Sequence, residues 1–278
     1  TIALSGQTGA VIRWESSTDN WATVTTIVNV NDAQGYTNLL QTTRYRAIVQ
    51  NGVCNVETTG DAIITVDAPT VPGTLSADAT VCASGNGGTI NLTGATGAIL
   101  RWESSTDNWA TVTTIANTNA NQSYTDLAQT TRYRAIVQNG VCAVETTNVV
   151  TITVDAVTNP GTLAADATVC ASGNSGTLTL TGFVGNIVRW ERSTNNWATV
   201  VTITNTTPNQ NYTNLPITTK YRVVVKNGVC AAATSADVTI TVNPTTIGGT
   251  LTGSNTVCAV SNSGTLTLFG AVGAIQHW

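Results

Sequence analysis

The residues able to do chemistry in this chain recur at one fixed spacing. The acidic and aromatic segment RWESSTDNWATV begins at Arg13, returns unchanged at Arg101, and returns as RWERSTNNWATV at Arg189. The cysteines form two series with the same step of 88 residues: Cys54, Cys142 and Cys230, then Cys82, Cys170 and Cys258. These types suggest thiol cross-linking or zinc binding by the cysteines, sugar binding by Asp beside Trp, and acid–base chemistry by carboxylates.

The cysteines favour disulfides over zinc. No CxxC pair is present, and the one histidine, His277, belongs to an incomplete copy of the repeat. Small Thr-rich units with fixed cysteines are typical of an oxidising, extracellular setting. Two pairings remain open: Cys82–Cys142 with Cys170–Cys230 inside units, or Cys54–Cys82, Cys142–Cys170 and Cys230–Cys258 between units.

Geometry favours the pairing inside units. Cys142 follows the Asn139-Gly140 turn, and a strand running from there to Asp155 would carry the chain roughly 40 Å away at about 3.3 Å per residue. A disulfide needs Cα atoms within about 7 Å. We therefore predict Cys82–Cys142 and Cys170–Cys230, with Cys54 and Cys258 bonded to residues outside this sequence.

The SSTDNW segment has a binding interpretation and a structural one. Sugar-contacting residues would be the second tryptophan of each copy and the acidic residue before it: Trp21, Trp109, Trp197, Asp19 and Asp107. The structural interpretation is a turn between two strands, with Thr, Asp and Asn supplying turn chemistry. Asn195 replaces the aspartate in the third copy, and the glycine of an Asp box is missing, so the turn interpretation is favoured.

Catalysis and metal binding have little support in the sequence. A nucleophile, a base and an orienting partner must converge, and no complete unit contains a histidine. Asp67 with Asp78, and Asp155 with Asp166, flank two junctions as in calcium linkers, but Asn243 and Ser254 stand at the third. We expect no catalytic residue, no metal and no cofactor.

The 88-residue step sets the domain organisation. We expect an N-terminally truncated unit at 1–70, complete units at 71–158 and 159–246, and a C-terminally truncated unit at 247–278, all cut from a longer array. Charged residues make up 9% of the chain, against about 25% in a typical protein. The net charge of −4 and pI near 4.8 disfavour nucleic acids and anionic membranes as partners.

Each unit is predicted to be all-β. Hydrophobic residues alternate with a period of two, placing Ile90 and Leu92 on one face of a strand, and Leu100 and Trp102 on one face of another. Asn139-Gly140 predicts a tight hairpin turn with positive φ. Seven or so short strands, with a Trp on the third major strand and a Tyr at the start of the penultimate one, fit an immunoglobulin-like β-sandwich. The predicted aromatic core consists of Trp14, Trp102, Trp190, Tyr45, Tyr133 and Tyr221.

Charged residues are predicted to form a ladder on the outer face of that sheet. Arg101 and Glu103 alternate with inward positions on one strand, and Arg132 and Arg134 do so on its neighbour. We expect all four side chains to face outward.

The segments VCASGNGGTINLTG, RWESSTDNWATVTTI, YTDLAQTTRYRAIVQNGVC and VTITV together carry a resemblance. Their order resembles the Ig-like domains strung in tandem through very large secreted proteins of Bacteroidetes, among them surface adhesins linked to gliding motility. The resemblance implies export to the cell surface and supplies no catalytic residue. The sequence departs from antibody domains because Ala47, Ala135 and Val223 stand where the strand-F cysteine would be.

These observations favour a structural function. We expect a stalk or fibre segment of a giant extracellular adhesin, in contact with neighbouring repeats and with no membrane insertion. Self-association into a fibre is expected because Lys220 and Lys226 are the only lysines that could blunt sheet edges. Alternatives are a repeat that binds surface glycans and a spacer in a secreted polysaccharide-degrading enzyme.

Overall fold

The computed structural model describes residues 1–164 and 166–277, and the described residues form an all-β chain of tandem sandwich repeats. Among these residues there is no helix of the length and hydrophobicity needed to cross a membrane. The chain divides into two compact units. One contains Thr1–Ala77, Thr89–Ser123 and Arg132–Thr151, and the other contains Asp78–Gly88, Tyr124–Thr131 and Ile152 onward.

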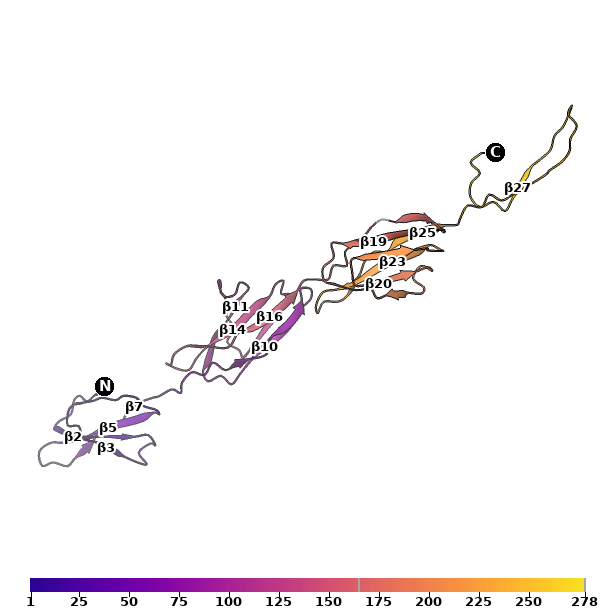
Figure 1. Cartoon of the computed structure of the whole chain (residues 1–278). Coiled ribbons are helices and arrows are strands. Elements are labelled where there is room, and N and C mark those ends of the chain that lie inside the picture. Colours follow the sequence, from indigo (N-terminus) through magenta and orange to yellow (C-terminus); the bar gives the residue numbers. More distant parts are fainter. Residues whose placement is uncertain (165, 278) are drawn as a thin grey trace. The chain divides into compact units, whose positions relative to one another are not determined.

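The third repeat shows the architecture most completely, because it lies within one unit. One sheet has the order β18-β25-β23-β20-β21 with β24 also paired to β23, and the facing sheet has the order β17-β19-β22. Figure 1 shows β20, β23 and β25 side by side, with β19 in the other layer. The strands are β17 (Thr162–Leu163), β18 (Ala167–Cys170), β19 (Ser175–Thr181), β20 (Asn186–Ser193), β21 (Val201–Ile203), β22 (Asn209–Thr213), β23 (Thr219–Lys226), β24 (Ala233–Thr234) and β25 (Val238–Asn243).

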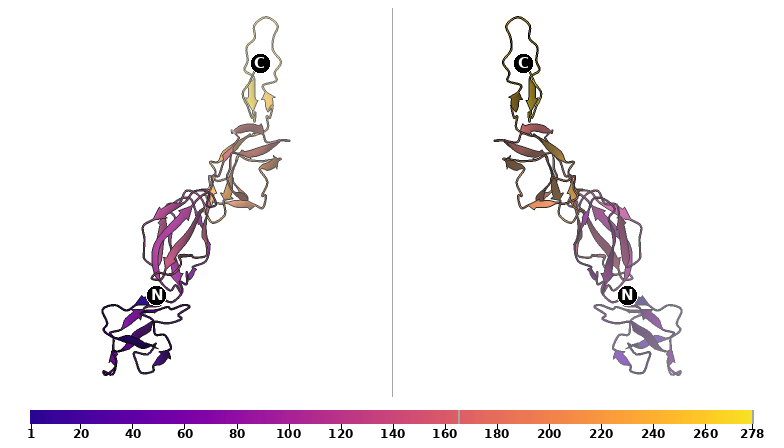
Figure 2. Two further views of the ribbon diagram at one scale, coloured as in Figure 1. Left: turned by 90° about the vertical axis from the view of Figure 1, so that its left-hand side faces the viewer. Right: turned by 90° about the vertical axis from the view of Figure 1, so that its right-hand side faces the viewer.

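The other repeats contain the corresponding strands. The second repeat has β8 (Thr74–Leu75), β9 (Ala79–Cys82), β10 (Gly87–Thr93), β11 (Ala98–Ser105), β12 (Thr113–Ile115), β13 (Asn121–Thr125), β14 (Thr131–Gln138), β15 (Glu145–Thr146) and β16 (Val150–Asp155). The first has β1 (Ile2–Ala3), β2 (Ala10–Ser17), β3 (Thr25–Ile27), β4 (Ala33–Gln34), β5 (Thr43–Gln50), β6 (Glu57–Thr58) and β7 (Ala62–Ile64). The last segment has one antiparallel pair, β26 (Thr250–Thr252) and β27 (Thr267–Phe269), seen as the yellow arrows of Figure 2.

Alternating residues explain why these segments become strands with one buried face. In β10, Ile90 and Leu92 are 1% and 6% exposed, while the threonine and asparagine between and beside them face solvent. In the third repeat, side chains from both sheets surround Trp190 in one core that includes Leu178, Leu180, Val223, Val225 and Ile240. Burial of these apolar side chains is the main term that stabilises each sandwich.

The prediction that Leu100 faces inward is wrong. The register between β11 and β14 shifts between Ile99 and Arg101, which is a β-bulge, and Leu100 is 41% exposed. An extra residue on one strand reverses the alternation on one side of it. The same shift occurs between Val11 and Arg13 in β2.

In the second and third repeats, the strand that ends in the cysteine, β9 or β18, runs parallel to the last strand of the same repeat, β16 or β25. β9 pairs with β16 so that Cys82 lies opposite Asp155, and β18 pairs with β25 so that Cys170 lies opposite Asn243. Cys82, the last residue of β9, therefore lies at the end of the second repeat from which the chain continues into the third.

The structure corrects the predicted disulfides. Cys82 is bonded to Cys230 of the following repeat, with Cα atoms 4.9 Å apart, and neither expected set contains this pair. Cys142 and Cys170 are free thiols here, as are Cys54 and Cys258. The prediction failed because it relied on the turn beside Cys142. That turn does not reveal the parallel pairing of β9 with β16, which places Cys82 at the other end of the repeat from Cys142.

Candidate functional site

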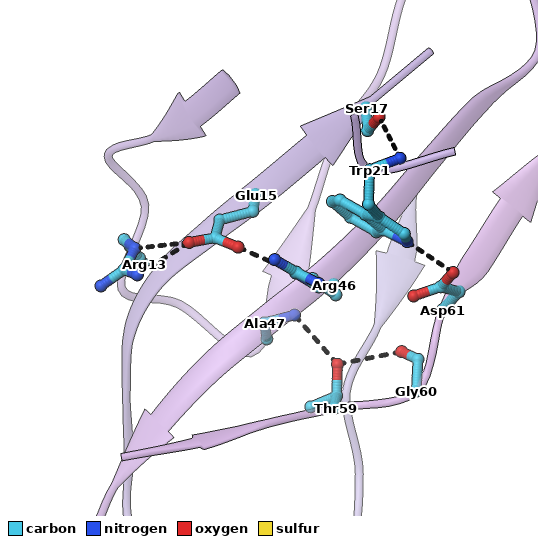
Figure 3. Close-up of polar contacts among 9 residues, drawn as sticks. All are labelled: Arg13, Glu15, Ser17, Trp21, Arg46, Ala47, Thr59, Gly60 and Asp61. Atoms are coloured by element: carbon cyan, nitrogen blue, oxygen red, sulfur yellow. Dashed lines mark hydrogen bonds and ion pairs between the residues drawn. The ribbon is translucent and has the colours of Figure 1, made fainter. Parts of the chain in front are cut away.

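A buried glutamate bound by two arginines lies on the outer face of each large sheet. In the first repeat, Glu15 accepts hydrogen bonds from Arg13 Nη2 at 2.7 Å and from Arg46 Nε at 2.8 Å, as Figure 3 shows. Glu103 and Glu191 each have two arginine partners at the corresponding positions of their own repeats. In both, the Nε of the arginine on the neighbouring strand lies 2.7 Å from the glutamate Oε2. The predicted charge ladder therefore exists, and its glutamates lie on the outward face as expected, where the arginines cover them.

The protonation of these glutamates follows from their partners. Burial alone would raise the pKa of Glu103, but hydrogen bonds and charge attraction from Arg134 and Arg101 outweigh it, and the pKa is lowered. Glu15 and Glu191 behave in the same way. The three groups are fixed as carboxylates and have both oxygens engaged, so they lack the raised pKa that a general acid would need.

The SSTDNW segment folds into a turn with an unusual backbone. Asn20 and Trp21 have φ of 58° and 72°, and Ala22 N donates to Asp19 O at 3.4 Å, which closes a turn with positive φ at both central residues. A tryptophan rarely adopts this conformation, because its Cβ crowds the backbone. Ser17 Oγ accepts the Trp21 N–H at 2.9 Å and helps to hold the backbone there.

Both carboxylate oxygens of the turn's aspartate accept hydrogen bonds from within the same segment. Asp19 Oδ1 accepts from Thr23 N at 2.9 Å and Oδ2 accepts from Thr23 Oγ1 at 2.6 Å, which lowers the pKa of Asp19 to about 2. Asp107 makes the same bonds with Thr111. Asn195 keeps the bond from Thr199 N at 2.9 Å with its amide oxygen. The aspartates therefore stabilise the turn, and the asparagine of the third repeat accepts the corresponding backbone hydrogen bond without a charge.

The second tryptophan of each copy is held by an arginine and, in two repeats, by an aspartate. Arg46 Cζ lies 3.9 Å from the ring centroid of Trp21, and the indole Nε1 donates to Asp61 Oδ2 at 2.8 Å (Figure 3). Trp197 has the same arrangement, with Arg222 at 3.9 Å and Asp237 at 3.1 Å. The rings are half-buried and partly committed to these contacts.

The second repeat lacks the aspartate. Arg134 Cζ still lies 4.1 Å from the Trp109 ring centroid, but Val149 occupies the position that corresponds to Asp61 and Asp237. No carboxylate can accept the indole N–H from that position.

The aromatic residues assigned to the core lie inside the sandwiches. Trp14, Trp102 and Trp190 are no more than 2% exposed, and Trp102 Nε1 donates to Asn119 O at 3.0 Å. The exposed fractions of Tyr45, Tyr133 and Tyr221 do not exceed 5%.

A second site, which sequence reasoning missed, joins the Asn-Gly turn of a repeat to the segment before that repeat. Asn139 N donates to Thr70 Oγ1 at 3.0 Å, and its side-chain amide donates to Ala68 O at 2.8 Å. Val141 N donates to Asp67 Oδ2 at 3.1 Å. One tight cluster of four hydrogen bonds results, since Thr70 Oγ1 also donates to Ala143 O.

The cluster recurs one repeat later with nearly equal distances. Asn227 N donates to Thr158 Oγ1 at 3.0 Å, its amide donates to Ala156 O at 2.7 Å, and Val229 N donates to Asp155 Oδ2 at 2.9 Å. The sequence signal was available in the constant spacing between VDA and NGVC. Asp67 and Asp155 thus bind backbone N–H groups at positions where calcium was considered, and the described residues contain no cluster of three metal-ligating side chains.

Two features of these turns favour glycine. Gly140 and Gly228 have φ of 51° and 45°, and a Cβ at either would collide with the carboxylate of Asp67 or Asp155. Only the glycine of the predicted Asn139-Gly140 pair has positive φ.

Three solved structures to which this chain is similar come from multidomain proteins. Consecutive domains of titin match with a TM-score of 0.38 and 15% identity, over 78% of each chain. Extracellular domains 3–5 of Drosophila OTK match with a TM-score of 0.38 and 10% identity, over 84% of this chain and 86% of that one. Fibronectin(III)-like modules of Clostridium thermocellum CbhA match with a TM-score of 0.29 and 15% identity, over 61% and 94%.

No curated protein matches the chain. One family model matches it three times in succession, at residues 1–68, 71–156 and 159–244, and its description is "Domain of unknown function (DUF8696)". The chain therefore belongs to the DUF8696 family, as a tandem array of Ig-like β-sandwich repeats.

Proposed function

We propose that this chain is a stalk or fibre segment of a very large extracellular surface protein, an adhesin of the kind strung with Ig-like repeats in Bacteroidetes. In this proposal the segment holds other parts of the protein away from the cell. In this proposal the segment has no catalytic role and needs no cofactor.

The observation that carries the proposal is the repeated junction cluster. At both junctions the Asn-Gly turn donates its backbone and side-chain N–H groups to the residues that follow the previous repeat's last strand. Thr158, which accepts from Asn227 N, is 9% exposed, so the hydrogen bond is largely protected from water. A linker held at several points bends less than a free one, which suits a spacer.

The test compares linker flexibility with and without the cluster. Small-angle X-ray scattering of Thr70→Ala/Thr158→Ala in the whole chain should give a broader distribution of lengths than the unaltered chain. Thr153→Ala is the control, because Thr153 is exposed, lies just before the junction and makes no side-chain hydrogen bond among the described contacts. Equal length distributions for the Thr70/Thr158 and Thr153 variants would contradict the proposal.

A second candidate is glycan binding at the SSTDNW turn. It is favoured by a hollow beside the first turn, lined by Ser17, Thr18, Asp19, Asn20, Thr42 and Arg44. The half-buried Trp21 follows Asn20 in the sequence. A glycan array probed with the chain and with Trp21→Ala/Trp109→Ala/Trp197→Ala distinguishes the two functions. Binding that disappears in the triple variant, while the folded state is retained, would replace the stalk proposal.

The proposal includes self-association of the chain into a fibre. The surface carries few charges, and a weak contact on one repeat recurs on every repeat, so that its effect grows with array length. Sedimentation velocity of the chain over a range of concentrations, followed by imaging of native material, tests this. A chain that stays monomeric at high concentration, together with fibres one chain thick, would limit the function to an isolated stalk.

A further inference from the structure

The Cys82–Cys230 bond is built around one shared neighbour. Cys82 is the ladder partner of Asp155 in the parallel pair β9–β16, and Cys230 Sγ lies 3.6 Å from Asp155 O and 3.3 Å from Ala156 O. The junction cluster places Cys230 there, because Val229 N is bound to the Asp155 carboxylate. Two independent contacts with the same residue therefore bring the sulfur atoms together.

Cys142 occupies the position of Cys230 one repeat earlier. Its Sγ lies 3.7 Å from Asp67 O and 3.3 Å from Ala68 O, and Val141 N is bound to Asp67. Whatever residue pairs with Asp67 in a parallel ladder, as Cys82 pairs with Asp155, would stand beside the Cys142 thiol.

Cys170 occupies the position of Cys82 one repeat later. It is the ladder partner of Asn243 in β18–β25, its carbonyl accepts from Asn174 Nδ2 at 2.8 Å, and its Sγ lies 3.7 Å from Ser172 Oγ. The corresponding distances at Cys82 are 2.8 Å and 3.6 Å. The Cys170 side chain is exposed, and hydrogen bonds from the backbone and side chain of Ser172 lower its pKa.

We propose that Cys142 and Cys170 are halves of further disulfides with the geometry of Cys82–Cys230. Cys170 bonds to the NGVC cysteine of a repeat that follows the third, and Cys142 bonds to the cysteine at the end of the first long strand of a repeat that precedes the first complete one. The partner is in each case another repeat of this sequence type.

The bond forms by thiol–disulfide exchange with an organic disulfide. The thiolate of Cys170 attacks one sulfur of the oxidant and releases a thiolate. The NGVC thiolate then attacks the mixed disulfide and releases the second, so that two cysteine thiols are oxidised while one disulfide is reduced to two thiols. The exposed Cys170 side chain is accessible for the first attack.

Such bonds would overlap along the chain. The observed bond spans a sequence separation of 148 residues, whereas the repeats are spaced by 88, so a bond from Cys170 begins before the one from Cys82 has ended. Every peptide bond between the outermost bonded cysteines of an array would then lie inside at least one disulfide loop. Closure of the array by such bonds does not depend on the stalk function.

Peptide mapping of the full-length native protein tests the proposal. Trypsin with a protease that cleaves before Asp, used without reductant, separates Cys142 in 135–154 from Cys170 in 166–189. The 166–189 peptide should be linked to an NGVC peptide of the next repeat, and alkylation before digestion should leave Cys142 and Cys170 unlabelled. Main species linking Cys142 to Cys170, linking Cys170 to Cys230, or containing alkylated Cys170 would overturn it.

The present chain supplies the internal control. Peptides 78–101 and 227–236 should be linked to each other, and Cys82→Ser should leave Cys230 open to alkylation without changing the labelling of Cys142. If Cys82→Ser instead causes Cys230 to pair with Cys170, the geometry around Asp155 does not determine the bond, and the proposal is wrong.

Discussion

The three glutamates under the arginines show how a single residue can fix the arrangement of a sheet surface. Glu103 is 4% exposed and joins two neighbouring strands, because Arg101 lies on its own strand and Arg134 on the next. Removing one partner from a buried ionic pair usually costs more than the pair contributes, since it leaves the other charge without its counterion.

We therefore expect Glu103→Gln to lower the free energy of unfolding of the second repeat by about 1 to 3 kcal/mol at pH 7. Because the folded pKa is lowered, this stabilisation is present above the ordinary value of 4.5 and is lost as the pH falls through the folded pKa. Hydrogen exchange of the second repeat in urea measures it. Glu145→Gln, an exposed glutamate in the same repeat, is the control, and an equal loss in both variants would contradict the expectation.

The second repeat also offers a substitution in the stabilising direction. Val149→Asp would place a carboxylate where Asp61 binds Trp21 Nε1 and Arg44 Nη1, at 2.8 and 3.2 Å, in the first repeat. We expect a gain of about 0.5 to 1 kcal/mol from the new contacts with Trp109 and Arg132. The urea midpoint of the second repeat measures the gain. Val144→Asp, at another exposed valine, should give none, and a gain that is equal at both sites would show that charge alone is responsible.

At the scale of the element, the SSTDNW turn is specified by side chains and not by glycine. Its two left-handed residues are an asparagine and a tryptophan. In the second repeat the turn is held because Ser105 Oγ accepts from Trp109 N and Asp107 Oδ1 accepts from Thr111 N. Since Asn195 makes the same backbone contact in the third repeat, the acceptor oxygen matters and the charge does not.

We expect Asp107→Asn to leave the turn folded and Asp107→Ala to open it. Amide exchange over 106–112 should be unchanged in the first variant and faster in the second. Fast exchange in both variants at pH 7 would mean that the charge is needed after all.

Sequence patterns were sufficient to predict the strands but not the register in which they pair. Alternation placed Ile90 and Leu92 correctly, because a regular strand has a period of two. The bulge before Arg101 broke that period for Leu100, and no residue type marks a bulge of this kind in advance. The disulfide depended on the direction of β9 relative to β16, a long-range pairing that the turn beside Cys142 does not reveal.

At the scale of the whole molecule, the disulfide links segments that are far apart in the sequence. Residues between Cys82 and Cys230 belong to one covalent loop that includes most of the second repeat and much of the third. A cut in the backbone inside this loop should leave one covalent molecule.

This can be tested with a specific protease site inserted after Gly173, an exposed loop residue between β18 and β19 with positive φ and open space around it. After cleavage, the chain should run as one species on a denaturing gel without reductant and as two fragments with it. The same insertion in Cys82→Ser should give two fragments under both conditions. Two fragments without reductant in the parent chain would show that the bond is absent.

The same loop determines where mechanical load travels. Tension applied to the ends of the chain enters the second repeat before Cys82 and has a direct covalent path to Cys230, so the backbone between them cannot be extended while the sulfur–sulfur bond is intact. At about 3.3 Å per extended residue, this withholds roughly 500 Å of contour length. Pulling on the oxidised chain should therefore extend only the segments outside the loop, and adding a reductant under tension should release the remainder as the sandwiches inside it unfold.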